Sequence, residues 1–205
     1  MKTTKKILIN FAHPAKSKSK INIALRKMVE NLDGVTINDL YDHYPDFMID
    51  ISREQGLCEA HDVIVFQHPF YWYQAPSIVK EWFDLVLEHG WAYGAMATAL
   101  KDKLFVQTLT AGGDAASYQA DGMNRYTIAE LTSPFRATAN LCKMASISPF
   151  TILGIHRGLP DEEIRFHAEN YRRFIVALRD NRLNLDMAKE IPCCSTHLDA
   201  IIGKE

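Results

Sequence analysis

Residues 6–32 read KILINFAHPAKSKSKINIALRKMVENL and describe a strand, a polar loop and a helix in turn. The apolar run at residues 7–12 is bounded by charged residues and followed by a histidine and a proline, which is typical of a strand buried on both faces. From Ser19 onward apolar residues recur at helical spacing, with Ser19 as the N-cap and Gly34 just past the end. A strand, a loop and a helix in this order predict the first unit of an α/β fold.

The same alternation continues along the chain. It implies a parallel sheet with helices on both faces, and five strands in this rhythm favour a flavodoxin-like, doubly wound sheet of order 2-1-3-4-5. We expect one such domain over residues 1–205, with residues 183–205 as a C-terminal extension available to cover a neighbouring subunit. The remaining predicted strands are residues 35–40, 63–66, 104–110 and 150–155, and the remaining helices are residues 52–60, 76–87, 126–144 and 161–179.

Composition indicates the class of protein. The chain has 205 residues, 47% hydrophobic and 23% charged, the profile of a globular protein long enough to bury a core. Its formal net charge of -2 provides no field for nucleic acid or an anionic membrane surface, so we expect no nucleic-acid partner. Four cysteines have the spacing of neither a disulfide framework nor a zinc site, and no signal peptide or membrane span is evident, so we expect a cytoplasmic protein.

Three loops should form the functional site. Ligands of an open parallel sheet bind beyond the carboxyl ends of the strands, where the strand order reverses. Here that place lies between the first and third predicted strands, so the loops that matter follow Ala12, Gln67 and Leu109.

The loop after Ala12 has the chemistry of an anion site. It runs into a helix, whose unpaired N–H groups and dipole favour a phosphate. It contains neither the G-x-G-x-x-G nor the Walker pattern, which disfavours a dinucleotide fold and an ATPase. A plain capped helix with a solvated basic loop remains the alternative. The hydrogen-bond donors that it offers are the side chains of His13, Ser17, Ser19 and Asn22, together with solvated lysines.

The other two loops favour a flat ligand. Residues 70–73 are four successive aromatics between prolines, a pattern that suits the cover of an isoalloxazine ring, although a cluster packed on the core or at a subunit contact is the alternative. The turn at residues 110–114 contains Gly112 and Gly113, which let the backbone approach a ligand closely. Its position opposite the aromatic loop strengthens this interpretation.

Other reactive residues give no catalytic pattern. The chain has no Ser-His-Asp set, no carboxylate pair in a shared loop and no histidines at metal-binding spacing, which leaves hydrolase and metal chemistry without support. His61 and His68 flank the third strand and favour structural roles. Cys193 and Cys194 are adjacent and lack the two intervening residues of the C-x-x-C redox motif, which favours ordinary thiols.

Five stretches together carry a family resemblance: AHP at 12–14, DLY at 39–41 running to YPDF at 44–47, FQHP at 66–69, KEW at 80–82, and HGWAYG at 89–94. In combination they resemble the flavodoxin-like NAD(P)H:quinone oxidoreductases, and within them the cytoplasmic ancillary subunits of glutathione-gated potassium efflux systems. This resemblance implies FMN as cofactor, with FAD as the alternative, and NAD(P)H as co-substrate. The flavin-binding residues that it implies are His13, Ser19, Ile21, Asn22, Phe70, Tyr71, Trp72, Tyr73, Leu109, Thr110, Ala111, Gly112, Gly113 and Tyr118.

The resemblance also implies catalytic residues. Tyr118 matches a tyrosine that lies beside the flavin in the animal quinone reductases and is proposed to help settle charge on the reduced ring. The histidine that shares this work six positions later is Asn124 here, which puts a histidine-assisted relay in doubt. Both residues are therefore candidates for a role in the chemistry.

The function that these features suggest is two-electron, ping-pong reduction of a quinone or a similar small electrophile by NAD(P)H. The resemblance implies a homodimer in which Trp91 and Tyr93 approach the partner's flavin. The alternative is a regulatory flavin-binding subunit that activates a membrane potassium efflux antiporter, at the inner face of the membrane. A flavodoxin-type electron carrier is disfavoured, because such carriers are strongly acidic and this chain is not.

Overall fold

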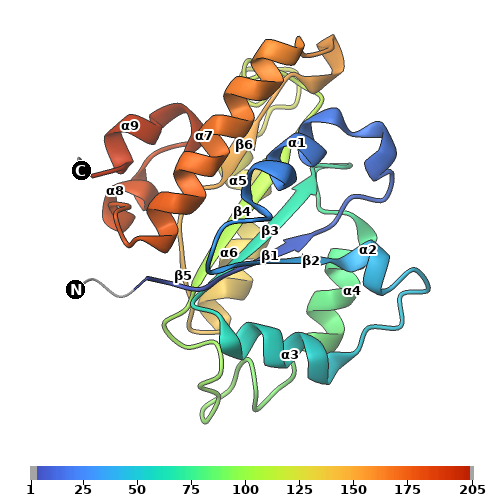
Figure 1. The fold of residues 1–205 in the computed structure, drawn as a ribbon, viewed down its shortest axis with the longest axis vertical. Helices are drawn as coiled ribbons and strands as arrows, with labels where there is room; N and C mark the ends of the chain where they lie inside the picture. Colours follow the sequence, from blue (N-terminus) through green and yellow to red (C-terminus); the bar gives the residue numbers. More distant parts are fainter. Residues whose placement is uncertain (1–3, 204–205) are drawn as a thin grey trace.

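A parallel sheet with helices on both faces forms the centre of the computed structural model, which describes residues 4–203 (Figure 1). The strand order is β2-β1-β3-β4-β5, with β6 also paired to β4, and every pairing is parallel. The predicted flavodoxin-like α/β fold and its order 2-1-3-4-5 are confirmed. The strands are β1 (Ile7–Phe11), β2 (Val35–Asp39), β3 (Val63–Pro69), β4 (Leu104–Thr110), β5 (Ala145–Ser146) and β6 (Phe150–Ile152).

The fifth strand position is divided between two short strands. β5 pairs with the start of β4 and β6 with its end, where Thr110 lies opposite Ile152. Between them comes Pro149, which has no N–H to donate to a ladder, and the Oγ of Ser148 donates instead to the Ile191 carbonyl at 2.6 Å. The strand predicted at residues 150–155 therefore ends at Ile152 and has an unpredicted companion.

Most helices begin and end near their predicted residues, and one predicted helix is divided. The expected helix 126–144 consists of α5 and α6, because Thr127 and Glu130 form a capping box on α5 and Pro134 opens α6 in its first turn, where a missing N–H does no harm. The short α2 was not predicted. The helices are α1 (Lys20–Val29), α2 (Leu40–His43), α3 (Ile51–Ala60), α4 (Ser77–Val86), α5 (Ile128–Leu131), α6 (Ser133–Leu141), α7 (Asp161–Arg179), α8 (Leu185–Glu190) and α9 (Leu198–Ile201), with 3-10 turns at η1 (Lys16–Lys18), η2 (Ile155–Arg157) and η3 (Ser195–His197).

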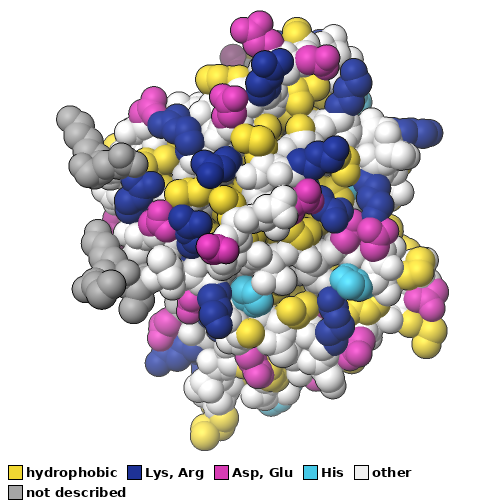
Figure 2. All heavy atoms as spheres, viewed as in Figure 1, with side chains coloured by type: hydrophobic (Ala, Val, Ile, Leu, Met, Phe, Trp, Pro, Cys, Tyr) yellow, Lys and Arg dark blue, Asp and Glu magenta, His cyan; other side chains and the backbone are white. Residues whose placement is uncertain are grey.

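The two faces of the sheet bury separate apolar cores. α1 and α7 cover one face, and α3, α4 and α6 cover the other (Figure 1). A third and smaller cluster, which includes Phe70, Leu109 and Tyr118, lies where β3 and β4 end. Basic and acidic side chains are interspersed over the face drawn in Figure 2, in keeping with the small net charge. The small cluster is the part of the core that adjoins the predicted site.

The described part of the C-terminal extension packs on its own chain. Leu183, Ala188, Leu198 and Ile201 are buried in the core that α7 covers, and α8 and α9 lie beside α7 in Figure 1. The N–H of Ser148 donates to the Ala188 carbonyl at 2.9 Å. The extension therefore covers the sheet edge at the break between β5 and β6.

Candidate functional site

The three predicted loops meet at the carboxyl end of β4. The N–H of Phe70 donates to the Thr110 carbonyl at 2.7 Å, and the Nδ2 of Asn22 donates to the Thr110 Oγ1 at 2.9 Å. The rings of His13 and Tyr71 meet edge to face, with their centroids 6.2 Å apart. The first loop, the aromatic loop and the glycine turn therefore surround one place, as the strand order requires.

The loop after β1 offers neutral hydrogen-bond donors. The Nδ1 of His13 accepts from the Ala15 N–H at 3.1 Å, which leaves its proton on Nε2. Burial lowers the pKa of His13, so its imidazole remains neutral. The N–H groups of Lys20 and Ile21, in the first turn of α1, donate to no acceptor within residues 4–203. These groups form a donor set that suits a phosphate.

Lys16 is held by carboxylates rather than solvated. Its Nζ lies 2.9 Å from the Asp39 Oδ2 and also pairs with Asp42. Although burial lowers the pKa of Lys16, the hydrogen bonds to Asp42 and Asp39 outweigh it and raise this pKa. Asp39 forms a second ion pair with Arg26, whose Nη1 lies 2.7 Å from the Asp39 Oδ2. Because Lys16 is paired with these carboxylates, it contributes less to phosphate binding than the sequence predicts.

The side chain of Asn22 positions neighbouring groups and is not the free hydrogen-bond donor that the sequence predicts. The side chain is fully buried, and its Nδ2 donates both to the Ser19 Oγ at 3.0 Å and to the Thr110 Oγ1. The backbone carbonyl of Asn22 accepts from the Nε2 of Gln67 at 3.0 Å. Asn22 thereby ties the start of α1 to the ends of β3 and β4. The side chain of the neighbouring Ile21 lies in the core, so only the Ile21 backbone is available to a ligand.

The aromatic loop is a strained two-residue hairpin. β3 continues to Pro69, beyond the predicted end at residue 66, and the Gln74 N–H then donates to the Tyr71 carbonyl at 2.9 Å. The residues between them, Trp72 and Tyr73, have left-handed φ angles of 50° and 63°. Such turns favour asparagine and glycine, and each bulky residue costs about 1 kcal/mol or more. Trp72 is 93% exposed, so packing within the chain does not account for this strain.

The turn after β4 presents its N–H groups. A Cβ on Gly112 would lie 2.3 Å from two atoms of the His156 ring, so a side chain there would have to displace that ring. The carbonyls of Gly112 and Gly113 accept from the N–H groups of His156 and Gly154, at 3.4 Å and 2.7 Å. Their own N–H groups have no acceptor among residues 4–203 and are available to a ligand.

His156 was not among the predicted site residues. The only feature of the sequence that marks it is the pair of glycines around it, Gly154 and Gly158, which have φ angles of 78° and 76°. They allow the tight η2 turn that brings His156 against Gly112. Two glycines after a short strand are common in loops, so this pattern alone identified no site.

Tyr118 and Asn124 lie in the loop that follows the glycine turn. The Tyr118 ring is buried, with its centroid 6.3 Å from that of Phe70. Burial, with the nearby Tyr73, raises the pKa of Tyr118, so its hydroxyl keeps its proton. Asn124 is held by its own N–H, which donates to the Ser117 carbonyl at 3.0 Å, and its Oδ1 accepts from the Tyr73 hydroxyl at 3.0 Å. Both predicted catalytic residues therefore border the site.

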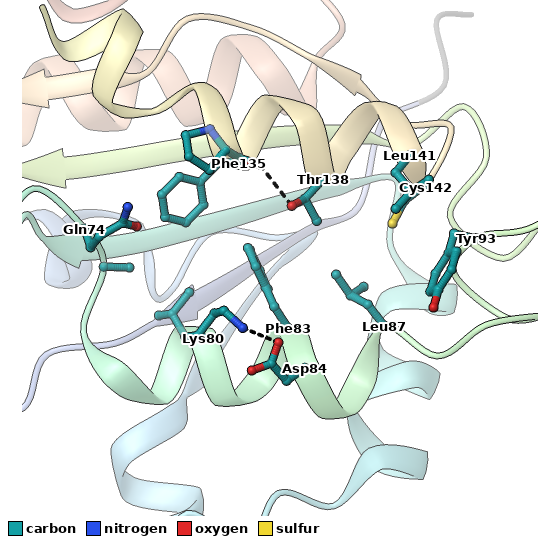
Figure 3. Close-up of a pocket in the computed structure, with 13 residues that line it drawn as sticks. Gln74, Lys80, Phe83, Asp84, Leu87, Tyr93, Phe135, Thr138, Leu141 and Cys142 are labelled. Atoms are coloured by element: carbon teal, nitrogen blue, oxygen red, sulfur yellow. Dashed lines mark hydrogen bonds and ion pairs between the residues drawn. The ribbon is translucent and has the colours of Figure 1, made fainter.

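An apolar groove continues from the aromatic hairpin. It has a volume of about 570 Å³ and lies between α4 and α6, with Gln74 and Ala75 at the hairpin end (Figure 3). The rings of Phe83 and Phe135 line it, and Tyr93 lies toward its other end. No motif of the sequence indicated this groove, because its two walls come from helices about 50 residues apart in the chain.

His61 and His68 have polar partners within the fold. His68 is fully buried, and burial lowers its pKa to about 4, while its Nδ1 lies 2.9 Å from the Pro69 carbonyl. His61 contacts the Leu57 carbonyl and the Thr36 Oγ1 at 2.7 Å and 2.8 Å. Within residues 4–203 no cluster of His, Cys, Asp or Glu could hold a metal ion, and no helix there has the length and apolarity needed to span a membrane. These contacts are consistent with the structural roles that the sequence favours for His61 and His68.

Comparison with known proteins places the chain in a family. The model of a family described as having a flavodoxin-like fold matches residues 5–175. The chain belongs to this family. It is 40% identical over 177 residues to the glutathione-regulated potassium-efflux system ancillary protein KefG of Enterobacter sp. (strain 638), a match that covers 86% of this chain and 96% of that protein.

Three solved structures share the fold at high similarity. General stress protein 14 of Treponema denticola, in complex with FMN, is 37% identical with a TM-score of 0.80, over 84% of this chain and 99% of that one. A chain described as a thermophilic tryptophan halogenase from Streptomycin violaceusniger is 40% identical with a TM-score of 0.79, over 82% and 98%. An NADPH-quinone reductase from P.pentosaceus is 28% identical with a TM-score of 0.74, over 82% and 96%.

Proposed function

We propose that this protein is a flavin-dependent NAD(P)H:quinone oxidoreductase that holds FMN, with FAD as the alternative. The observation that carries the proposal is the meeting, at the end of β4, of a donor loop, a strained aromatic hairpin and a bare glycine turn. A similar protein was solved with FMN, and another is described as an NADPH-quinone reductase. These descriptions support the cofactor and the class of reaction.

The donor loop fits the phosphate of a flavin mononucleotide. The N–H groups of Lys20 and Ile21 and the Nε2 of His13 would bind it, while Asn22 fixes Ser19 in place. A neutral imidazole is a suitable donor to an oxyanion, because it brings no charge that burial would penalise. The phosphate charge would be met by backbone dipoles rather than by Lys16.

The isoalloxazine ring would lie between the two remaining walls. One wall is residues 70–73, where the exposed rings of residues 71–73 suit a flat apolar ligand and Phe70 is buried beneath them in the small cluster. The other is residues 109–113, where Leu109, Thr110 and Ala111 are buried and the N–H groups of Gly112 and Gly113 are unpaired among the described residues. Unpaired N–H groups beside a bare backbone suit the oxygen and nitrogen atoms of the ring edge.

A flavin held by these residues would supply the redox chemistry, which is acceptance of a hydride from NAD(P)H and two-electron delivery to a quinone in a ping-pong cycle. This chain supplies the position and the polarity of the site. The Tyr118 hydroxyl would donate a hydrogen bond to negative charge that develops in the site, together with the N–H groups of the glycine turn. The apolar cluster of Phe70, Leu109 and Tyr118 borders these donors, and an apolar surrounding would strengthen their hydrogen bonds.

We propose that the protein works as a cytoplasmic homodimer. The groove between α4 and α6 and the exposed Leu141 on its rim form an apolar surface that continues into the aromatic hairpin. Trp91, on the neighbouring segment, is held by a hydrogen bond from its Nε1 to the Glu59 Oε1 at 2.7 Å. A second copy seated on this surface would complete the acceptor site. Light scattering should give twice the mass of one chain, and a monomer would contradict this arrangement.

A regulatory role is the second candidate. The similarity to KefG supports a flavin-binding ancillary subunit that acts on a potassium efflux antiporter at the inner face of the membrane. The two functions differ in what the isolated protein does. Quinone-dependent oxidation of NADPH by the purified protein alone supports the enzyme, whereas co-purification with an antiporter, without such turnover, supports the regulatory subunit.

The central test is spectral. Protein refolded with excess FMN or FAD and then desalted should retain one flavin per chain, measured by its absorbance and identified by the mass of the released cofactor. A matched sample of the His13→Ala variant should retain less under the same dilution. Absence of flavin absorbance from the parent protein after desalting would refute the proposal.

A further inference from the structure

A single side-chain hydrogen bond joins the aromatic hairpin to the loop after the glycine turn. The Tyr73 hydroxyl donates to the Asn124 Oδ1 at 3.0 Å, across 51 positions of the sequence. Within residues 4–203 no other side-chain hydrogen bond connects residues 71–74 with residues 114–126. The bond therefore joins one wall of the candidate flavin site, residues 70–73, to the loop that continues from the other wall.

The two ends of this bond differ in how firmly the chain holds them. Asn124 is fixed at its backbone, where its N–H donates to the Ser117 carbonyl. Tyr73 is 45% exposed and has the left-handed φ of 63°, in a turn whose sequence is poorly suited to that conformation. The hairpin therefore has a tendency to relax, and the bond to Asn124 opposes it.

The bond also lies beside the proposed catalytic hydroxyl. Tyr73 is one of the causes of the raised pKa of Tyr118, so the two phenols are within electrostatic reach of each other. Movement of Tyr73 would open the space next to Tyr118. The position of Tyr73 would therefore influence which molecules can reach the isoalloxazine ring of a bound flavin.

We propose that the Tyr73–Asn124 hydrogen bond is a latch across the flavin site that slows flavin release and limits the size of the electron acceptor. This inference rests on the proposed function. Tyr73 and Asn124 act in it as positioning residues, and Asn124 contributes its amide oxygen rather than a proton. Acceptors of the size of a simple benzoquinone enter with the latch closed, and acceptors with bulky ring substituents require it to open.

The test compares two variants that break the bond from opposite ends, Tyr73→Phe and Asn124→Ala, with their double variant. Each should speed flavin release about 3- to 10-fold, the usual worth of one partly exposed hydrogen bond, and the double variant should add nothing further. Release is measured by the recovery of flavin fluorescence after dilution. Tyr126→Phe is the matched control, because Tyr126 is 57% exposed and its hydroxyl has no hydrogen-bond partner within residues 4–203.

Acceptor size gives a readout that general loosening would not change. In both single variants the KM of a bulky substituted naphthoquinone should fall relative to that of benzoquinone. A uniform change for both acceptors, an additive double variant, or the same effects in Tyr126→Phe would overturn the latch.

A measurement without flavin keeps the two proposals separable. Amide hydrogen exchange at residues 71–74 of the flavin-free protein should be about 3- to 10-fold faster in each latch variant and unchanged in Tyr126→Phe. Equal exchange and equal flavin release in parent and variants would overturn the latch alone. A parent protein that binds no flavin would overturn the proposed function, and with it the role assigned to the latch.

Discussion

Replacement of Tyr118 by phenylalanine removes one hydroxyl and little else. The ring is buried, and the hydroxyl has no hydrogen-bond partner within residues 4–203, so no buried group loses its partner. We therefore expect the free energy of unfolding to change by less than about 1 kcal/mol. Flavin should stay bound, because phosphate and ring have the other contacts proposed above.

The expected loss is in the rate of flavin reduction. Removal of one donor to a charge that develops in a dry site typically costs about 10- to 1,000-fold. Burial and the nearby Tyr73 raise the pKa of Tyr118, so the parent should show no loss from ionisation of this hydroxyl at neutral pH. Asn124→His in the Tyr118→Phe background tests whether a histidine at that position restores rate.

Stopped-flow bleaching of the flavin by NADPH isolates this half-reaction from quinone release. A Tyr118→Phe bleaching rate equal to that of the parent would refute the role of the hydroxyl. It would mean that the N–H groups of Gly112 and Gly113 suffice for the charge, and that Tyr118 only packs against Phe70.

Three further outcomes are expected. His13→Ala combined with Asn22→Ala should weaken flavin binding in a titration by about 1 to 3 kcal/mol while the protein still folds, and unchanged affinity would place the phosphate elsewhere. Gly112→Ala should lower the free energy of unfolding in urea by about 1 to 3 kcal/mol, because its methyl meets the His156 ring at 2.3 Å, and His156→Ala should recover most of that loss. Since burial lowers the pKa of His68 to about 4, its contribution to stability is complete above about pH 6.5 and falls as the pH drops toward 4, by about 3 kcal/mol in all, and His68→Gln should remove this part of the pH dependence.

The architecture was predictable because its information is local. Each buried strand is a short apolar run, and the helix starts carry visible caps such as Ser19, whose Oγ accepts from the Asn22 N–H at 3.3 Å. The errors lie where one residue interrupts a pattern that otherwise continues. Pro149 separates β5 from β6, and the Thr127 cap with Pro134 separates α5 from α6. A hydrophobic pattern is judged over many residues and so passes over a single interruption. A backbone hydrogen bond depends on one residue, and its loss ends the helix or strand.

The candidate site was predictable in its location and less so in the work of each residue. The strand order brings the three loops together, which requires no knowledge of side-chain contacts. That Lys16 pairs with Asp39, and that the Asn22 amide donates to Thr110, depends on residues distant in sequence. His156 and the groove between α4 and α6 likewise arise from tertiary packing alone.

Gln74 belongs to two structures at once. Its N–H closes the hairpin onto Tyr71, and its side chain borders the groove between α4 and α6. A molecule that binds in the groove and immobilises Gln74 reduces the conformational freedom of the hairpin. A ligand bound under the hairpin likewise reduces the conformational freedom of the groove. By thermodynamic linkage the two effects are equal. The factor by which a molecule in the groove raises the affinity for the ligand is also the factor by which the ligand raises the affinity for that molecule. If that molecule is a second copy, cofactor affinity rises with protein concentration.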